Sequence, residues 1–311
     1  MEGTLDTALN KCNICPRNCG VDRLNGHCGY CGMNSTIKVA RASLHMWEEP
    51  CLSAKNGSGT VFFAGCSLKC VYCQNKKIAI DNNGIELSAE QLAEVFLLLQ
   101  EKKANNINLV TPTHYTFQII KAIEIAKNRG LFLPIVYNTG SYEKVETLKY
   151  LDGLVDIYLP DLKYKSNILA LKYSNAPDYF EVADEAIEEM VRQTKATIFE
   201  DGIMKKGVIV RHMILPGNTK DSKEIIQHLY SKYKNKIFIS IMNQYTPYVD
   251  LENYSEINRK ITKREYDKVV DFAIELGVEN AFIQCGNTAE ESFIPDFNQA
   301  EFLDELHKYM K

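Results

Sequence analysis

Short apolar runs and amphipathic segments alternate along the chain from residue 60 onward. The runs are rich in Val, Ile and Phe, and their apolar positions are mostly consecutive rather than alternating. Consecutive apolar positions are typical of parallel strands that are buried on both faces. The pattern therefore predicts buried strands at residues 60–64, 106–110, 133–137, 155–159, 208–212, 237–241 and 281–284.

The segments between these runs carry signals for the ends of helices. Ser followed by Gln at residues 88–91, and Thr followed by Glu at residues 262–265, are capping boxes that open helices. Gly130 and Gly277 follow periodic segments and are typical of the position just after a helix. This alternation predicts a parallel α/β fold, either a partial or full (β/α) barrel or a doubly wound open sheet. In each of these folds, the chemistry belongs at the C-terminal ends of the strands.

Composition and charge narrow the class of protein. Of the 311 residues, 45% are apolar and 24% are charged, which is ordinary for a globular protein. The longest apolar stretches, such as residues 95–99, are far shorter than the ~18–20 residues of a membrane span. The first ten residues show no signal-peptide pattern, and a net charge of −4 argues against a nucleic-acid-binding face. We therefore expect a cytoplasmic protein with neither a membrane nor a nucleic acid as partner.

Cysteine usage is the unusual feature of the composition. The chain has 10 cysteines, and Cys285 alone lies beyond residue 73. Many of the others are separated by two or three residues, and no secretion signal precedes them. In a cytosolic protein, such close spacing favours metal binding or catalysis over disulfides.

The first predicted buried strand leads directly into three of these cysteines. Cys66, Cys70 and Cys73 form a CxxxCxxC motif immediately after the strand at residues 60–64. Structural zinc sites usually have four protein ligands. Three cysteines without a local fourth ligand instead suit a [4Fe–4S] cluster in which one iron stays open. A zinc site or inert thiols are the alternatives.

This motif, in this strand context, resembles that of the radical S-adenosylmethionine (SAM) superfamily. The resemblance implies that the amino and carboxylate groups of SAM chelate the open iron, and that one electron cleaves SAM to a 5′-deoxyadenosyl radical that abstracts a hydrogen atom. It also implies an oxidoreductase that works in an anaerobic setting with a one-electron donor such as flavodoxin or ferredoxin. We therefore expect a radical SAM partial (β/α) TIM-type barrel over residues 59–311, preceded by a metal-stapled, Cys-rich head and connector over residues 1–58.

Two further segments resemble the SAM-contacting features of glycyl-radical activating enzymes. Asp161-Leu-Lys163 follows the strand at 155–159, and His212 ends the strand at 208–212. The resemblance implies that Lys163 neutralises the carboxylate of SAM and that His212 bonds its ribose or carboxylate. It implies that Asp161 holds a cation or the SAM amine. The alternative is a surface tripeptide and a structural histidine.

Residues 108–114 occupy the place of the glycine-rich SAM-amine segment of the superfamily, but they lack its glycines and its glutamate. Thr111 and Thr113, or their carbonyls, would then replace that segment, and His114 is a candidate acid or base on the substrate side. Further candidates come from the end of the third strand and from the cluster loop: Asn138 and Thr139 for the SAM or cation site, and Tyr72 for packing on the adenine or simply in the core.

The N-terminal segment carries a second group of cysteines, with glycines that allow tight turns around a metal. Two CxxC pairs resemble a zinc knuckle, although thiolates suit a second iron–sulfur cluster equally well. Free thiols are the third alternative. Four ligands suffice, so one of the five is spare: Cys12, Cys15, Cys19, Cys28 and Cys31.

The head, residues 39–51 and the cluster loop together resemble a Cys-rich subfamily related to pyruvate formate-lyase activating enzymes. The resemblance implies a glycyl radical enzyme as partner. Residues 57–63 lack the arginine that such activases carry there, and the head replaces their usual ferredoxin-like insert. Radical modification of a small molecule or of another macromolecule is the alternative reaction. A non-enzymatic iron–sulfur or zinc-binding protein is the alternative class.

The segment just before the first buried strand is polar and aromatic. It contains His45, Trp47, Glu48 and Glu49, which either cap the barrel bottom or line the site. The alternative is a packed connector with a solvated acidic pair. Cys51 and Cys285 are expected to be buried as small apolar side chains. Because Cys285 follows a late strand, it is also a candidate to face the substrate.

Overall fold

The computed structural model describes residues 7–247 and 251–284. Seven parallel strands form the centre of its main sheet, in the order β10-β9-β8-β6-β5-β4-β2. Each predicted strand is present, so the consecutive apolar runs were interpreted correctly. The parallel strands are β2 (Ser58–Phe63), β4 (Ile107–Val110), β5 (Ile135–Thr139), β6 (Ile157–Pro160), β8 (Ile203–Met213), β9 (Phe238–Met242) and β10 (Ala281–Ile283).

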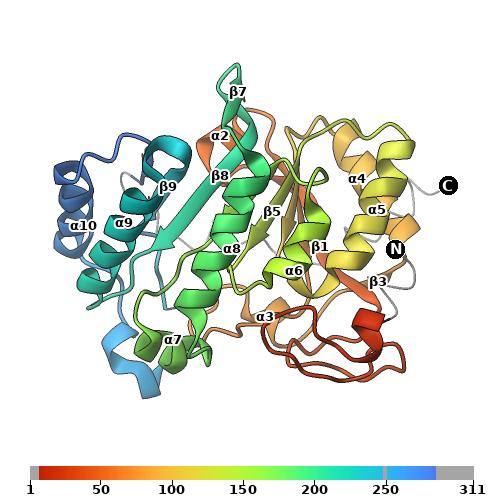
Figure 1. The fold of residues 1–311 in the computed structure, drawn as a ribbon, viewed down its shortest axis with the longest axis horizontal. Coiled ribbons are helices and arrows are strands. Elements are labelled where there is room, and N and C mark those ends of the chain that lie inside the picture. The colour runs from red at the N-terminus through yellow and green to blue at the C-terminus, as the bar shows by residue number, and fades with distance from the viewer. Residues whose placement is uncertain (1–6, 248–250, 285–311) are drawn as a thin grey trace.

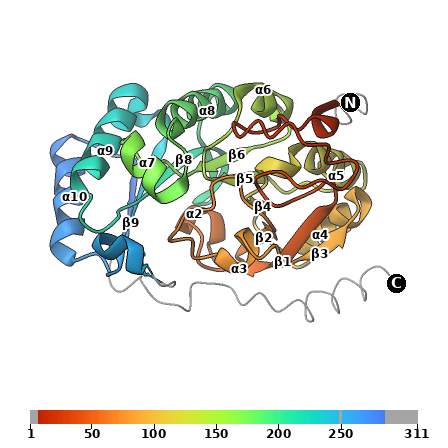
Figure 2. The ribbon, with the colours of Figure 1, turned by 90° about the horizontal axis from the view of Figure 1, so that it is seen from below.

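The sheet curves into a partial barrel, with its main helices on the convex face (Figures 1 and 2). Among the described residues it does not close, because β10 and β3 end the strand order. This arrangement confirms the predicted α/β fold, and it is consistent with the partial barrel. The helices are α2 (Pro50–Ser53), α3 (Lys76–Ala79), α4 (Ala89–Glu101), α5 (Thr116–Asn128), α6 (Val145–Leu148), α7 (Asn167–Ser174), α8 (Tyr179–Thr194), α9 (Thr219–Tyr233) and α10 (Lys263–Glu275).

Both predicted capping boxes are present. Ser88 Oγ accepts from the backbone N–H of Gln91 at 3.1 Å, and Gln91 Oε1 accepts from the N–H of Ser88 at 2.9 Å. Thr262 and Glu265 form the same reciprocal pair at the start of α10. These bonds satisfy backbone donors that the first turn of a helix leaves unpaired.

Three strands lie outside the predicted set: β1 (Ile37–His45), β3 (Ile85–Leu87) and β7 (Ile198–Glu200). β1 lies in the region predicted to be a connector, where it pairs antiparallel with both β2 and β3. Its residues mostly alternate between buried and partly exposed positions, as expected for a strand near the edge of a sheet. A search for consecutive apolar residues therefore misses it. β7 forms an antiparallel hairpin with β8.

The short helix α2 lies on the concave side of the sheet (Figure 2). Cys51 and Leu52 are buried there against Ile157 and Leu159 of β6. The amide of Asn106 donates to the carbonyl of Leu52 at 3.0 Å, which ties α2 to the start of β4. The segment before β2 therefore fills the barrel from the N-terminal ends of the strands, and Cys51 is buried as predicted. No helix in the described part of the chain is both long and apolar enough to cross a membrane.

Candidate functional site

The three-cysteine loop follows β2, as predicted, and backbone hydrogen bonds hold it from several sides. The N–H of Cys66 donates to the carbonyl of Cys31 at 3.3 Å, and the N–H of Val71 donates to the carbonyl of Tyr173 at 2.9 Å. Cys70 is buried, whereas Cys66 and Cys73 are half-buried. The loop therefore lies between the N-terminal segment and α7.

Gly65, just before the loop, permits a close approach that no other residue would. Its φ is +84°, and an added Cβ would lie 2.5 Å from Met33 Cγ and 2.9 Å from the carbonyl oxygen of Cys31. Only glycine fits both the backbone angle and the space. The start of the loop is thus pressed against the N-terminal segment.

The three thiols are electrostatic neighbours. Cys66 and Cys70 both contribute to raising the pKa of Cys73, although burial is the largest cause and takes that pKa to about 12. Burial also raises the pKa of Cys70, while the ammonium of Lys163 opposes this effect. No three Cys, His, Asp or Glu side chains in the described ranges stand as a single-ion site. Three neighbouring sulfurs beside one cation nevertheless suit the donor set of an iron–sulfur cluster.

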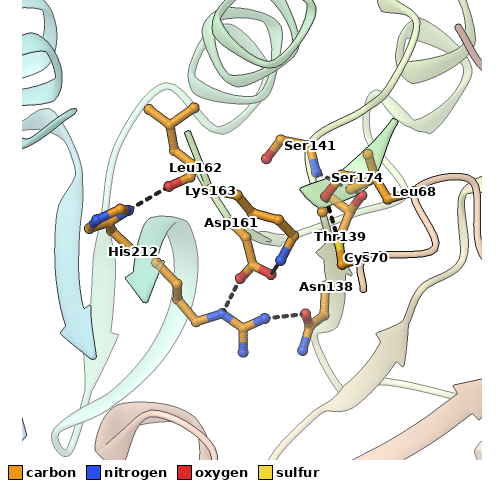
Figure 3. Close-up of polar contacts among 12 residues, drawn as sticks. Leu68, Cys70, Asn138, Thr139, Ser141, Asp161, Leu162, Lys163, Ser174 and His212 are labelled. Carbon is orange, nitrogen blue, oxygen red and sulfur yellow. Dashed lines mark hydrogen bonds and ion pairs between the residues drawn. The ribbon is translucent and has the colours of Figure 1, made fainter. Parts of the chain in front are cut away.

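A layer of paired charges lies beside the loop at the ends of β5, β6 and β8 (Figure 3). Asp161 Oδ2 accepts from Lys163 Nζ at 2.7 Å, and Asp161 Oδ1 accepts from Arg211 Nε at 2.8 Å. Arg211 also donates to Asn138 Oδ1 at 2.7 Å. Burial alone would raise the pKa of Asp161, but the two cations outweigh it and lower that pKa. Burial disfavours the charged form of Lys163, but the carboxylate of Asp161 outweighs this effect and raises the pKa of Lys163.

Glu48 reaches this layer from the opposite side. Its Oε2 accepts from Asn108 at 2.9 Å and from Asn138 at 3.2 Å, and its Oε1 lies 3.7 Å from Arg211 Nη1. The segment before β2 therefore places Glu48 against the charged layer, where it is engaged by protein groups and is not part of a solvated acidic pair. Arg211 joins the whole layer, a role that the sequence analysis did not assign to it.

Thr113 and Thr139, both predicted near SAM, converge on a buried carboxylate. Thr113 Oγ1 donates to Glu143 Oε1 at 2.5 Å, and Thr139 Oγ1 donates to the same oxygen. Burial raises the pKa of Glu143 to about 7. The sequence analysis did not single out Glu143. The signal that could have found it is a carboxylate four residues after Thr139. The two threonine hydroxyls are therefore already engaged below the surface of the site.

Three non-glycine residues adopt left-handed backbone angles in the loops that follow β2, β4 and β5. They are Lys69 (φ 52°), Thr111 (φ 59°) and Ser141 (φ 64°). Such angles cost energy and concentrate at functional sites. Ser141 Oγ and Asn108 Oδ1 are buried and have no hydrogen-bond partner among the described residues. Unpaired buried polar atoms of this kind fit a site that holds a polar ligand.

Gly140 provides space between the loop and the charged layer. An added Cβ would lie 2.8 Å from Leu68 Cδ1 and 3.5 Å from Lys163 Cε. The missing side chain lets the cysteine loop approach the end of β5 closely. The unpaired buried oxygens and the neighbouring thiols fit the predicted cluster and SAM.

The structure places His212 beside the predicted SAM residues but turned away from them (Figure 3). Its Nδ1 lies 2.7 Å from the carbonyl oxygen of Leu162, and its Nε2 lies 2.9 Å from Ser222 Oγ. Burial lowers the pKa of His212 to about 4, so the neutral ring donates from Nδ1 and accepts at Nε2. His212 thereby fixes Leu162, between Asp161 and Lys163, and neither ring nitrogen is left for a ligand.

His114 lies beneath the cysteine loop. Its Nε2 donates to the carbonyl of Ala64 at 2.7 Å, and Arg23 Nη1 donates to the carbonyl of His114 at 2.7 Å. Burial lowers the pKa of His114 to about 3. This placement favours a supporting role for His114 over its predicted role in acid–base chemistry.

Tyr72, predicted to pack on adenine or in the core, is buried within a cluster of aromatic rings. Its hydroxyl lies 2.6 Å from the hydroxyl of Tyr164. The hydroxyl of Tyr164 lies 2.8 Å from Ser174 Oγ, which donates to Cys70 Sγ at 3.0 Å. A continuous chain of hydroxyl groups thus leads to the sulfur of Cys70.

In the N-terminal segment, one of the five predicted metal ligands stands apart. Cys12, Cys15 and Cys31 are buried, Cys19 is half-buried, and Cys28 is exposed. Cys31 lies close enough to Cys12 and Cys19 for their charges to interact. Cys15 likewise interacts with Cys12 and Cys31. These four thiols are near enough to influence one another's charge, whereas Cys28 is exposed, and no three of these five described thiols stand as a single-ion site.

Groups that stabilise thiolates surround these four cysteines. The N–H of Tyr30 donates to Cys19 Sγ at 3.2 Å, and the fully buried Arg23 lies 4.0 Å from Cys12 Sγ through its Nη1. Burial raises the pKa of Cys15 to about 12, although a hydrogen bond from the backbone of Arg17 opposes this rise. Hydrogen bonds and a nearby cation favour thiolates, which are the form that binds metals.

A cavity of about 500 Å³ opens beside the charged layer, near β10. The amide of Gln284 donates to Gln244 Oε1 at 3.3 Å, and Gln74, next to Cys73, donates to the carbonyl of Gln244 at 3.3 Å. These hydrogen bonds join the lining of the cavity to the end of the cysteine loop. Cys285 lies outside the described residues. The polar lining of the cavity includes Glu48, Glu49, Ser53, Arg211, Gln244 and Gln284.

Comparisons with known proteins agree on the family. Residues 60–229, more than half of the chain, match the family described as the radical SAM superfamily. An uncharacterised protein of Methanocaldococcus jannaschii is 29% identical over 277 residues, which cover 85% of this chain and 75% of that protein. The pyruvate formate-lyase-activating enzyme of Clostridium pasteurianum is 30% identical over 189 residues, which cover 56% of this chain and 68% of that enzyme.

Two solved structures match this chain at low sequence identity. Streptococcus suis SuiB bound to S-adenosylmethionine has a TM-score of 0.49 and 16% identity, and the match covers 72% of this chain and 49% of SuiB. This chain thus spans about half the length of SuiB. Methylornithine synthase has a TM-score of 0.49 and 13% identity, with 80% of this chain and 81% of that chain covered.

Proposed function

We propose that this chain, which belongs to the radical SAM superfamily, cleaves SAM reductively and uses the resulting radical to abstract a hydrogen atom. Membership of the superfamily implies a [4Fe–4S] cluster, SAM binding and radical chemistry. The residue assignments and the substrate are our proposals. The observation that carries the assignment is the placement of Cys66, Cys70 and Cys73 in one loop beside Lys163.

We assign Cys66, Cys70 and Cys73 as the three cluster ligands. When bound, such a cluster supplies the one electron that splits the sulfonium of SAM into methionine and a 5′-deoxyadenosyl radical. Abstraction of a hydrogen atom from the substrate would then yield 5′-deoxyadenosine and a substrate radical. The left-handed backbone angle within the loop and the close packing of the loop against Gly140 support this placement.

Lys163 is proposed to bind the carboxylate of SAM. It stays charged because Asp161 raises its pKa, and Arg211 holds Asp161 from the other side. A fixed, partly buried ammonium forms a strong charge-assisted bond with a carboxylate. Asn138, Thr111 and the unpaired hydroxyl of Ser141 are the remaining polar groups proposed around SAM.

For the substrate, we propose a glycine residue in a protein or peptide chain. The partial match to an enzyme named for activating pyruvate formate-lyase supports this class. A cavity with an exposed Trp47 beside the carboxylates of Glu48 and Glu49 suits an extended, amide-bearing ligand. A one-electron donor of the flavodoxin or ferredoxin type, and a cytoplasmic, anaerobic setting, belong to the same proposal.

The first experiment tests the chemistry. The protein is reconstituted with iron and sulfide under anaerobic conditions, reduced with dithionite and given SAM. We expect about four irons in the loop cluster and formation of 5′-deoxyadenosine in wild type, with both lost in Cys70→Ala. Cys51→Ala is the matched control, because Cys51 is equally buried but packs against β6. Equal activity in Cys70→Ala would overturn the assignment, and zinc without iron would favour a non-enzymatic metal protein.

The second experiment tests the substrate class. Reconstituted protein and SAM are incubated with pyruvate formate-lyase as a probe of a protein glycine. Electron paramagnetic resonance then measures the glycyl radical against 5′-deoxyadenosine. Equal amounts of the two support glycine activation. SAM cleavage without any protein radical would favour a small molecule or another macromolecule.

We also propose that Cys12, Cys15, Cys19 and Cys31 hold a metal in the head, either zinc or a second iron–sulfur cluster. The exposure of Cys28 supports its role as the spare cysteine. Such a site would stabilise a segment that carries little regular structure.

Metal analysis of single variants tests this assignment. We expect Cys31→Ala to lose the head metal and Cys28→Ala to keep it, with zinc or with iron plus sulfide identifying its kind. Equal loss in both variants would contradict the choice of four. Absence of any head metal in wild type would support free thiols.

A further inference from the structure

The hydroxyl chain that reaches Cys70 has no role in the function proposed above. It begins at Tyr72, passes through Tyr164 and ends at Ser174, whose Oγ lies 3.0 Å from Cys70 Sγ. The exposed fractions of these four side chains are 5%, 0%, 1% and 8% in that order. Because water has so little access, each hydroxyl depends on its neighbour for a hydrogen bond.

The chemistry of the sulfur sets the direction of the whole chain. A cysteine that ligates iron is a thiolate, which accepts hydrogen bonds but has no proton to donate. Ser174 must then donate its one hydroxyl proton to Cys70. Tyr164 must donate to Ser174, and Tyr72 must donate to Tyr164. Hydrogen bonds aligned in one direction polarise and strengthen one another.

Hydrogen bonds to backbone carbonyls hold Ser174 close to Cys70. Arg17 Nη2 donates to the carbonyl of Ser174 at 3.0 Å, and Arg17 Nε donates to the carbonyl of Ser67, in the cysteine loop, at 2.8 Å. The bond from Val71 N–H to the carbonyl of Tyr173 joins the same two segments. One side chain and one backbone bond thus clamp the end of α7 to the loop. These contacts hold the backbone of Ser174 at a fixed place beside Cys70.

We propose that Ser174, Tyr164 and Tyr72 are positioning residues that raise the reduction potential of the cluster by donating a directed series of hydrogen bonds to Cys70. This inference rests on the proposed assignment of Cys70 as a cluster ligand. A reduced cluster carries one more negative charge, and a hydrogen bond to a ligand sulfur stabilises that charge. Ser174 acts directly, whereas the two tyrosines act by polarising Ser174.

The test is a graded series of substitutions: Ser174→Ala, Tyr164→Phe and Tyr72→Phe. The midpoint potential of the reconstituted cluster is measured by redox titration followed with electron paramagnetic resonance. We expect a shift to more negative potential in each variant. The shift should be largest for Ser174→Ala, smaller for Tyr164→Phe and smallest for Tyr72→Phe. Ser174→Cys retains a weaker donor of similar size and should give a shift smaller than that of Ser174→Ala.

Tyr173→Phe is the matched control. Tyr173 lies in the same aromatic cluster, 6.3 Å between ring centroids from both Tyr72 and Tyr164. Its hydroxyl donates to Glu256 at 2.7 Å and is not part of the chain. We expect the potential of Tyr173→Phe to match wild type. A shift as large as that of Tyr164→Phe would show a general effect of packing and overturn the inference.

A second readout reports the hydrogen bond itself. After exchange into deuterated water, pulsed electron–nuclear double resonance should detect an exchangeable deuteron near the reduced cluster in wild type and lose it in Ser174→Ala. If Ser174→Ala fails to fold, Tyr164→Phe and Ser174→Cys decide the question. Unchanged potentials with a cluster intact would overturn this inference alone, whereas the absence of any cluster in wild type would overturn the proposed function.

Discussion

The guanidinium of Arg17 donates from Nε to the carbonyl oxygen of Ser67 at 2.8 Å, across 50 residues of sequence. Arg17 lies between two of the head cysteines, and Ser67 lies between two of the cysteines proposed to bind the cluster. The planes of Tyr30 and Tyr142 lie beside the same guanidinium, at 4.1 and 5.0 Å from ring centroid to Cζ. The Cys-rich head is thus attached directly to the three-cysteine loop.

Replacing Arg17 should loosen this attachment. Arg17→Ala removes hydrogen bonds to three carbonyl oxygens, and we expect it to lower the free energy of unfolding by about 1–3 kcal/mol. Arg17→Lys keeps the charge but not the planar fork, so it should recover only part of that stability. Urea unfolding measures the stability, and the rate of iron release to a chelator measures the loop. Wild-type values for both in Arg17→Ala would contradict the attachment.

Lys163 should determine the affinity for SAM. Lys163→Met removes the ammonium proposed to bind the carboxylate, and we expect the dissociation constant for SAM to rise about tenfold or more. The fold should survive, because Asp161 keeps its bond to Arg211. Calorimetric titration of the reconstituted protein measures the constant. Lys220→Met is the control, because the side chain of Lys220 is 93% exposed. Unchanged affinity in Lys163→Met would remove Lys163 from the site.

Gly65 should be irreplaceable, whereas another left-handed glycine should not. In Gly65→Ala, the new Cβ would clash with Met33 and with the carbonyl of Cys31, in addition to straining the backbone. Gly130→Ala has the same kind of strain, with φ +99° and nothing within 4 Å of its Cβ. We expect Gly130→Ala to cost about 1–2 kcal/mol and Gly65→Ala clearly more, with loss of iron from the loop. Thermal unfolding and iron content test this contrast, and equal effects would refute it.

The parts of this fold that could be predicted from sequence are those with local signals. Buried parallel strands appear as consecutive apolar residues, and capping boxes appear as residue pairs three positions apart. β1 was missed because its polar positions, such as Lys38 and Arg41, interrupt the apolar run in a strand one place from the edge of the sheet. A run of consecutive apolar residues marks a strand only when the whole strand is buried on both faces.

The contacts between residues of the site could not be predicted from local sequence patterns. Spacing predicted Cys66, Cys70 and Cys73 as cluster ligands, and a resemblance together with their place after a strand predicted Asp161 and Lys163 as SAM contacts. Glu48 meets Asn138 across 90 residues of sequence. The orientation of His212 likewise depends on Ser222 in α9. Contacts of this kind depend on how the whole sheet curves, and no short motif records them.

Glu143 should make stability depend on pH in a specific direction. Burial raises its pKa from 4.5 in the unfolded chain to about 7 in the folded protein, so the folded state holds the proton more tightly. The free energy of unfolding should therefore fall as the pH rises from about 4.5 to about 7 and then level off. The contribution amounts to about 3 kcal/mol. His114 and His212 act in the opposite direction below pH 6.5, because burial lowers their pKa values to about 3 and about 4.

Comparison with Glu143→Gln isolates this carboxyl group, because the two histidines are the same in both proteins. Gln keeps an oxygen that can accept from Thr113 and Thr139, but it does not ionise. We expect the stability difference between wild type and Glu143→Gln to favour wild type most strongly near pH 4.5 and to decline by about 3 kcal/mol towards pH 8. Urea unfolding at a series of pH values, followed by circular dichroism under anaerobic conditions, measures it. A difference that stays constant with pH would mean that Glu143 is ionised in the folded protein, and that the threonine hydroxyls and nearby dipoles fully offset its burial.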